Sequence, residues 1–133
     1  MPRFQLPIIN NQLIADIFII NTKEISLKNQ PVKALLDTGA TQSCIVCNLA
    51  RELNLQIIGK TEINTAAGIT EANKYKLRIG MPFLMENNLR VEAPPEVEVT
   101  EIPEQPTFSV ILGMDIIRQG ILIISGKTYI FGL

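Results

Sequence analysis

Residues Leu35 to Thr41 read Leu-Leu-Asp-Thr-Gly-Ala-Thr, and this stretch places a carboxylate directly after an apolar run. Ionisable side chains are seldom buried unless they are paired or functional. Asp37 is one of only three aspartates in the chain. The residues before it, Val32–Leu36, predict a buried strand, and Gly39 allows other backbone to pass close by. The stretch therefore predicts a strand that delivers Asp37 to a tight loop.

The chemistry that one carboxylate can perform in such a loop is limited. A single aspartate is a poor catalyst of peptide hydrolysis, whereas two carboxylates about 3 Å apart share one proton. The protonated carboxyl acts as general acid, and the ionised one takes a proton from a water between them. Asp16 has no Thr-Gly after it and Asp115 suits a helix start. The economical partner is Asp37 of a second copy across a two-fold axis, which predicts a homodimer.

Elsewhere in the chain, alternation of apolar and polar residues is more frequent than helical periodicity. It predicts strands at Leu13–Ile20 and Tyr75–Ile79, and a hairpin over Leu122–Phe131 that turns at Ser125-Gly126-Lys127. Two short helices are predicted, at Cys47–Leu55 and at Met114–Gly120, the second with Asp115 as N-cap. Many short strands without a βαβ rhythm predict an all-β sandwich or barrel.

The bulk composition limits the possible function classes. The length of 133 residues suits a single domain over residues 1–133, and 47 % hydrophobic residues suffice for a core. A net charge of -1 gives no general attraction to nucleic acid or to an anionic membrane. Neither a secretory signal nor an apolar run of about 18 residues is evident, so a cytoplasmic location is expected.

Two segments together resemble a known family. Ala34–Ile45 reads Ala-Leu-Leu-Asp-Thr-Gly-Ala-Thr-Gln-Ser-Cys-Ile, and Val110–Ile117 reads Val-Ile-Leu-Gly-Met-Asp-Ile-Ile. This pattern is similar to the retroviral-type aspartic proteases, the retropepsins and their cellular relatives, from about Val32 to Leu133. The resemblance implies a retropepsin-like acid protease barrel with one lobe per chain and one or two short helices. It also implies completion of the fold as a symmetric homodimer.

The resemblance also implies roles for individual residues. Asp37 would be the catalytic aspartate, and the Thr38 hydroxyl would bond across the dimer to the other loop. Gly39 would lie close to the carboxylates, and the small Ala40 would lie beside them at the substrate. The stretch Ile111-Leu112-Gly113 would pack behind the catalytic loop, with Ile111 also lining the cleft.

A hairpin flap that closes over a bound peptide is implied as well. Residues 60–80 are the candidate, with a tip near Ala66-Ala67-Gly68-Ile69 that would contact the substrate, and lids of this kind exclude water. An ordinary hairpin is the alternative. Viral members can join both termini in a sheet between subunits, and Thr128–Leu133 is the candidate for this here. Residues 1–30 are expected to form N-terminal strands, but they match no motif of the family.

The segment Glu92–Pro106 differs in composition from the rest. It contains four of the eight prolines, five glutamates and no Lys or Arg. This composition predicts a solvated acidic, proline-rich loop or a protected edge strand. The alternative is an acidic rim of the cleft that favours basic peptides.

The predicted function is an aspartic endopeptidase that hydrolyses an extended polypeptide without a metal, a cofactor or a covalent intermediate. Three alternatives stay open. The Asp-Thr-Gly stretch also fits a phosphate loop of an actin-like ATPase, although that fold needs a far longer chain. Cys44 and Cys47 could form a redox pair or half of a zinc site, although a third cysteine and histidines are lacking. A non-catalytic dimerisation or peptide-binding module on the same fold is the third, since a fold does not guarantee activity.

Overall fold

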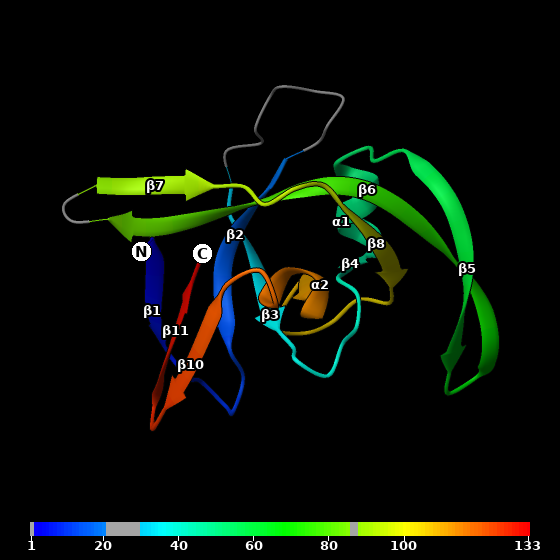
Figure 1. Cartoon of the computed structure of the whole chain (residues 1–133). Helices are drawn as coiled ribbons and strands as arrows, with labels where there is room; N and C mark the ends of the chain where they lie inside the picture. Colours follow the sequence, from blue (N-terminus) through cyan, green and yellow to red (C-terminus); the bar gives the residue numbers. More distant parts are fainter. Residues whose placement is uncertain (1, 21–29, 86–87) are drawn as a thin grey trace.

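The computed structural model of the chain describes residues 2–20, 30–85 and 88–133. It is built almost entirely of strands (Figure 1). In chain order these are β1 (Arg3–Pro7), β2 (Ile14–Ile20), β3 (Val32–Leu36), β4 (Cys44–Val46), β5 (Ile57–Thr65), β6 (Gly68–Met85), β7 (Asn88–Glu92), β8 (Val97–Ile102), β9 (Val110–Leu112), β10 (Ile121–Ser125) and β11 (Thr128–Gly132). The two helices are α1 (Cys47–Glu52) and α2 (Met114–Ile117).

Six strands close into a hydrogen-bonded ring in the order β6, β2, β3, β9, β4 and β8, and β8 pairs back with β6. Neighbours are antiparallel except in the pairs β3–β9 and β4–β8. Small and branched aliphatic side chains fill the inside of this ring, as a narrow barrel requires. Ala34, Leu36, Ile45 and Leu112 are each at most 4 % exposed. The predicted all-β barrel with two short helices is therefore confirmed.

The two longest walls of the barrel show why the sequence folds in this register. In β2, Ala15, Ile17 and Ile19 are buried, and in β6 every second residue from Leu77 to Phe83 is buried. Because successive side chains of a strand point to opposite faces, this period of two directs one face to the core. Each large side chain that is fully buried contributes about 1.5–3 kcal/mol. A slip of one residue would move the whole set to solvent.

The sheet continues beyond the barrel through β1, β11 and β10. It packs through an aromatic cluster of Phe4, Phe83, Tyr129 and Phe131, with ring centroids 5.4 to 6.5 Å apart. The predicted hairpin over Leu122–Phe131 is confirmed as β10 and β11. However, β11 is paired on both edges, with β1 and with β10. Strand β11 therefore has no free edge for direct pairing with a second copy, and the expectation that Thr128–Leu133 joins a sheet between subunits stays a prediction.

The expected acidic loop over residues 92–106 is wrong for its central part, which forms β8 inside the ring. The prolines flank this strand, and its glutamates are paired with a lysine or accept hydrogen bonds from neighbouring residues. Each of the five glutamates has a partner: Glu92 with Arg90 at 3.6 Å, Glu96 with Lys76 at 3.6 Å, Glu98 with Lys74 at 3.3 Å, Glu101 with the Tyr75 hydroxyl at 3.2 Å, and Glu104 with the Asn48 amide at 2.7 Å. These contacts give no support to an acidic rim that attracts basic peptides.

Both predicted helices are present but shorter than predicted. The N-cap of α2 is Gly113, and Asp115 lies inside the first turn, so the prediction of Asp115 as N-cap is wrong. Among the residues that the structure describes, neither helix has the length or apolar character needed to cross a bilayer.

Candidate active site

The loop that follows β3 fixes the position of the Asp37 carboxylate. The Asp37 amide donates to the carbonyl of Leu112 at 2.9 Å, which ties the end of β3 to the end of β9. The Gly39 amide donates to Asp37 Oδ1 at 2.9 Å. A Cβ atom on Gly39 would lie 3.2 Å from the same oxygen, so a larger residue would crowd the carboxylate. The loop thus holds Asp37 by both its backbone and its side chain.

The end of β9 supports this loop from behind. The Met114 amide donates to the Ala40 carbonyl at 2.8 Å, and the Ala40 amide donates to the Asp37 carbonyl at 3.1 Å. A Cβ on Gly113 would lie 2.7 Å from the backbone of Gln42 and 2.8 Å from the Ala40 carbonyl oxygen. Only glycine fits there. The structure therefore brings Leu112 against Asp37 and Gly113 against Ala40, whereas Ile111 pairs with Leu35 and Cys44.

A buried hydrogen-bond network that the sequence did not reveal joins the other end of the loop to α2. Ser43 is fully buried, and its hydroxyl donates to Asp115 Oδ1 at 2.8 Å while its amide donates to Oδ2 at 2.9 Å. The same hydroxyl accepts from the Gly113 amide at 3.1 Å. Asp115 also accepts from the Ile116 amide at 2.9 Å. The carboxylate therefore links the loop at Ser43 to the first turn of α2, and the Ser43 hydroxyl adds the Gly113 backbone to the network.

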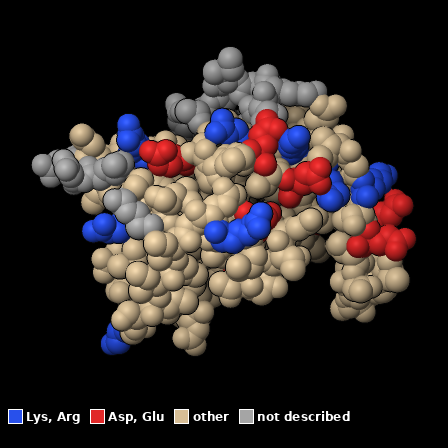
Figure 2. Space-filling view, viewed as in Figure 1, with Lys and Arg blue, Asp and Glu red and all other residues tan. Residues whose placement is uncertain are grey.

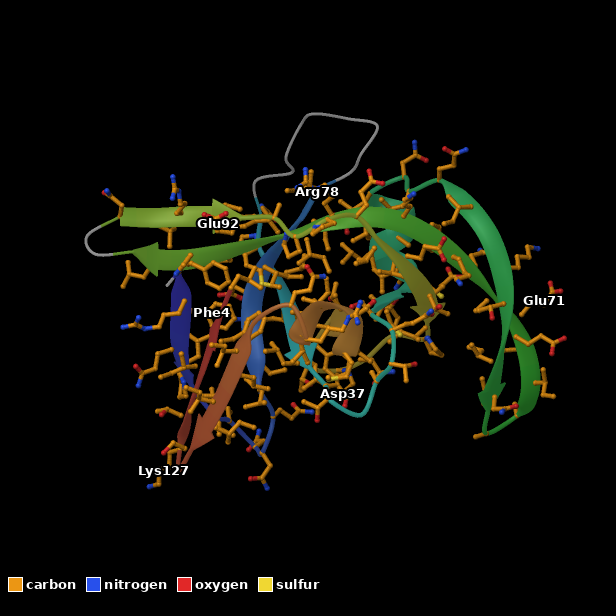
Figure 3. All side chains as sticks on the ribbon, viewed as in Figure 1. Phe4, Asp37, Glu71, Arg78, Glu92 and Lys127 are labelled. Carbon is orange, nitrogen blue, oxygen red and sulfur yellow. The ribbon has the colours of Figure 1, made fainter. Side chains whose placement is uncertain are left out.

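The three aspartates have different surroundings. Asp16 forms an ion pair with Lys33 at 2.7 Å, and Asp115 is held by Ser43. Asp37 is half-buried and bonds to the Gly39 backbone, and its neighbour Thr38 is exposed. In Figure 3, Asp37 lies at the lower surface of the molecule, towards which the β5–β6 hairpin also points. Asp37 is thus the aspartate that remains available for chemistry at a surface.

The hairpin predicted as a flap is formed by β5 and β6, with Thr65 paired to Gly68 across a two-residue turn at Ala66-Ala67. Gly68 has φ +112°, a conformation that favours glycine. The Thr65 hydroxyl donates to the Gly68 carbonyl at 2.8 Å, which tightens the tip. Ile69 is 70 % exposed and shares its face of β6 with Glu71, which points away from the body in Figure 3.

The two cysteines lie at the start of β4 and of α1, and both are free thiols. Burial raises the pKa of Cys44, and the carboxylates of Asp115 and Asp37 raise it further. Burial and the neighbouring Glu101 raise the pKa of Cys47. A raised pKa keeps a thiol protonated, which disfavours redox chemistry and metal binding. Within the described residues, no group of three or more His, Cys, Asp or Glu side chains is placed to hold a metal ion.

The barrel and the loop are similar to solved structures. A retropepsin-like aspartic protease from Rickettsia conorii superposes with a TM-score of 0.64 and 13 % identity, covering 97 % of this chain and 89 % of that one. The simian foamy virus (mac) protease, in a solution structure, gives a TM-score of 0.51 and 21 % identity, covering 80 % and 92 %. At these identities the likeness shows the fold alone.

Comparison of the sequence with known families and proteins identifies the family, which the structural likeness alone does not. No curated protein matches the chain. The model of the family described as "gag-polyprotein putative aspartyl protease" matches residues 23–119, which contain the Asp-Thr-Gly loop, the hairpin, β9 and α2. This match spans well over half of the chain. The chain therefore belongs to the gag-polyprotein aspartyl protease family.

Proposed function

We propose that this protein is an aspartic endopeptidase that works as a homodimer, with its active site formed by Asp37 of each copy. The proposal rests on the different partners of the three aspartates. Asp16 and Asp115 are engaged elsewhere, whereas Asp37 is held at a surface loop. A dyad needs a second carboxylate about 3 Å away, and neither Asp16, paired with Lys33, nor Asp115, bonded to Ser43, is placed to supply it. A second copy is the remaining source.

The proposed reaction follows from one proton shared between two carboxylates. The ionised Asp37 accepts a proton from water as the water oxygen attacks the peptide carbonyl carbon. The protonated Asp37 donates to the carbonyl oxygen, which gives a neutral tetrahedral diol. Transfer of a proton to the amide nitrogen then breaks the C–N bond and releases an acid and an amine. Because the reaction needs one protonated and one ionised carboxylate, activity should have a bell-shaped pH dependence.

Several features of the loop support these roles. The Gly39 amide donates to one oxygen of Asp37 and so fixes the orientation of the carboxylate. A carboxylate that is already oriented needs no rearrangement during the reaction. The exposed Thr38 lies beside it, where its hydroxyl would bond to the loop of the second copy. Ala40 and Ile111 would face the substrate. The β5–β6 hairpin would act as the flap, with Ala66, Ala67, Gly68 and Ile69 at its tip over an extended polypeptide.

The test is hydrolysis of a mixed peptide library by purified protein, with Asp37→Asn as the matched variant. Asn is nearly isosteric, so the variant should keep its thermal unfolding temperature and its dimer while cleavage disappears. Specific activity of the wild type should also fall on dilution below the dimerisation constant. Cleavage by Asp37→Asn, or activity from a proven monomer, would refute the proposal. A wild type that binds peptides without cleaving them would identify a binding module instead.

A further inference from the structure

Strand β7 is paired on one edge only. It runs antiparallel to β6, from Asn88 against Met85 to Glu92 against Met81. Among the residues that the structure describes, no strand pairs with its other edge. In an antiparallel pair, alternate residues direct their N–H and C=O groups away from the partner strand. The outer edge of β7 therefore has backbone donors and acceptors with which a further strand can pair.

One face of the β6–β7 hairpin carries apolar side chains outside the core. Leu84 and Leu89 lie directly opposite each other and are 62 % and 69 % exposed, and Val91 is 48 % exposed. This face is turned away from the core, because Phe83, which precedes Leu84, is fully buried. Val91 packs over Gly80, where a Cβ atom would lie 2.9 Å from Val91 Cγ1. Contiguous exposed apolar side chains are typical of a protein–protein contact.

The other face of β7 carries one charge of each sign. Arg90 Nε lies 3.6 Å from Glu92 Oε1, and the two side chains are 64 % and 38 % exposed. Charged side chains usually protect a free edge, since an identical strand brings the same charge to it. Arg90 and Glu92 have opposite charges and are separated by one residue, so they do not give this protection in every register.

A second copy of β7 is complementary to the first in one antiparallel register. With Val91 opposite Val91 of the second copy, Arg90 lies opposite Glu92 and Glu92 opposite Arg90. Opposite charges at directly opposed positions stabilise a strand pair. On the other face, Leu89 then lies opposite Ala93, so that apolar side chains meet. A two-fold axis through Val91 generates this arrangement and forms each contact twice.

The edge of β7 lies far from the catalytic loop. In Figure 3, Glu92 lies on the upper side of the molecule and Asp37 at its lower surface. Figure 1 shows β7 at the upper left, beyond the barrel. Figure 2 shows basic and acidic side chains interspersed along this upper side, so no excess of one sign repels a second copy there. A second copy on β7 therefore leaves the surface around Asp37 open.

We infer that β7 pairs antiparallel with β7 of a second copy, in the register that places Val91 on the two-fold axis. The pairing joins the β6–β7 hairpins of two molecules into one continuous sheet. It is independent of the proposed peptidase dimer, which forms at Asp37. Where that dimer forms as well, each dimer has two β7 edges, and the pairing links one dimer to the next. Because the paired edge is short, the association is reversible and depends on protein concentration.

The first test exchanges the two charges of β7. Arg90→Glu and Glu92→Arg would be purified separately, and the average molar mass of each would be followed by sedimentation equilibrium over a range of concentrations. In either variant the directly opposed charges repel, so the dissociation constant of the β7 contact should rise about thirtyfold. An equimolar mixture should associate as the wild type does, because one chain presents two acids and the other two bases. Mixing does not restore the ion pair within a chain, so recovery identifies a contact between copies.

Lys76→Glu is the matched control. Lys76 Nζ lies 3.6 Å from Glu96 Oε2, and these side chains are 52 % and 38 % exposed, much as those of Arg90 and Glu92 are. The loss of this pair should leave the association unchanged. Thermal unfolding would establish that each variant is folded, since the loss of an exposed ion pair costs little stability.

A second measurement does not depend on disruption. Val91→Cys would be oxidised mildly, and disulfide-linked dimers would be scored on non-reducing gels against wild type and Leu84→Cys. Directly opposed residues of an antiparallel pair have Cα atoms about 4.5–5.5 Å apart, within reach of a disulfide. Cross-linking should be strong in Val91→Cys. It should stay at the wild-type level in Leu84→Cys, whose residue is exposed on the same face but lies on β6.

The outcomes separate this inference from the proposed function. Weaker association of both charge variants, recovery in the mixture and a cross-link at position 91 support the β7 pairing. A mixture that associates no better than its components, or Val91→Cys that cross-links no more than Leu84→Cys, overturns it. A wild-type dimer whose mass is unchanged by either charge variant overturns the β7 pairing and leaves the peptidase dimer standing. A wild type that stays monomeric at high concentration overturns both.

Discussion

Ser43→Ala tests whether the buried network between the catalytic loop and α2 stabilises the protein. The change removes a hydroxyl that donates to Asp115 and accepts from the Gly113 amide, at 2.8 and 3.1 Å. A hydrogen bond to a charged group contributes about 1.5–3 kcal/mol, and an unsatisfied buried amide costs about 1–3 kcal/mol. Because the two terms share one atom they do not add fully, and we expect about 3 kcal/mol.

The assay is urea unfolding at fixed protein concentration, with thermal unfolding beside it. For a domain of this length, 1 kcal/mol corresponds to about 4 °C, so the unfolding temperature should fall by about 12 °C. Thr41→Ala is the control, since Thr41 is exposed in the same loop and should change stability by less than about 0.5 kcal/mol. If Ser43→Ala unfolds at the same urea concentration as Thr41→Ala, the network contributes nothing and the reasoning fails.

Three further predictions concern other parts of the fold. Gly113→Ala should destabilise the protein by about 3 kcal/mol or more because its Cβ has no room, whereas Gly59→Ala, in open space, should change thermal unfolding by less than about 1 kcal/mol. Burial raises the pKa of Tyr129 above its ordinary value of 10.0, so the unfolded chain loses this proton first and stability should decline as the pH rises above 10.0. Urea unfolding across alkaline pH should show less of this decline in Tyr129→Phe. Lys33→Ala removes an ion pair whose side chains are 59 % and 51 % exposed, and denaturant titration should detect a loss of less than about 1 kcal/mol.

Local patterns in the sequence predicted the local parts of the structure. The alternation in Leu13–Ile20, the buried strand before Asp37 and the turn at Gly126 each arise from neighbouring residues, and each is found where expected. The Asp-Thr-Gly loop and the Ile-Leu-Gly stretch were linked because both match one family pattern. These features therefore needed no knowledge of distant contacts.

Long-range contacts explain what could not be predicted. Ser43 and Asp115 are 72 residues apart, and nothing near Asp115 distinguishes a helix cap from a partner of a buried serine. Strand β8 reads as a loop because proline and glutamate are poor strand formers. Its two glutamates are acceptable in the ring because Lys74 of β6 pairs with Glu98 and the Tyr75 hydroxyl of β6 donates to Glu101. Only the pairing of β6 with β8 reveals that compensation.

The insertion of β9 between β3 and β4 constrains when the site can form during biosynthesis. The loop that carries Asp37 is held by the Leu112 carbonyl and by Gly113, which are translated some 75 residues later. A nascent chain that has not yet exposed β9 contains the complete Asp-Thr-Gly sequence but not the groups that orient its carboxylate. Joining such distant segments is slow because the intervening chain must be ordered first. Under the proposed function, cleavage has to wait until β9 and Gly113 have left the ribosome, because the Asp37 loop is not held in place before then.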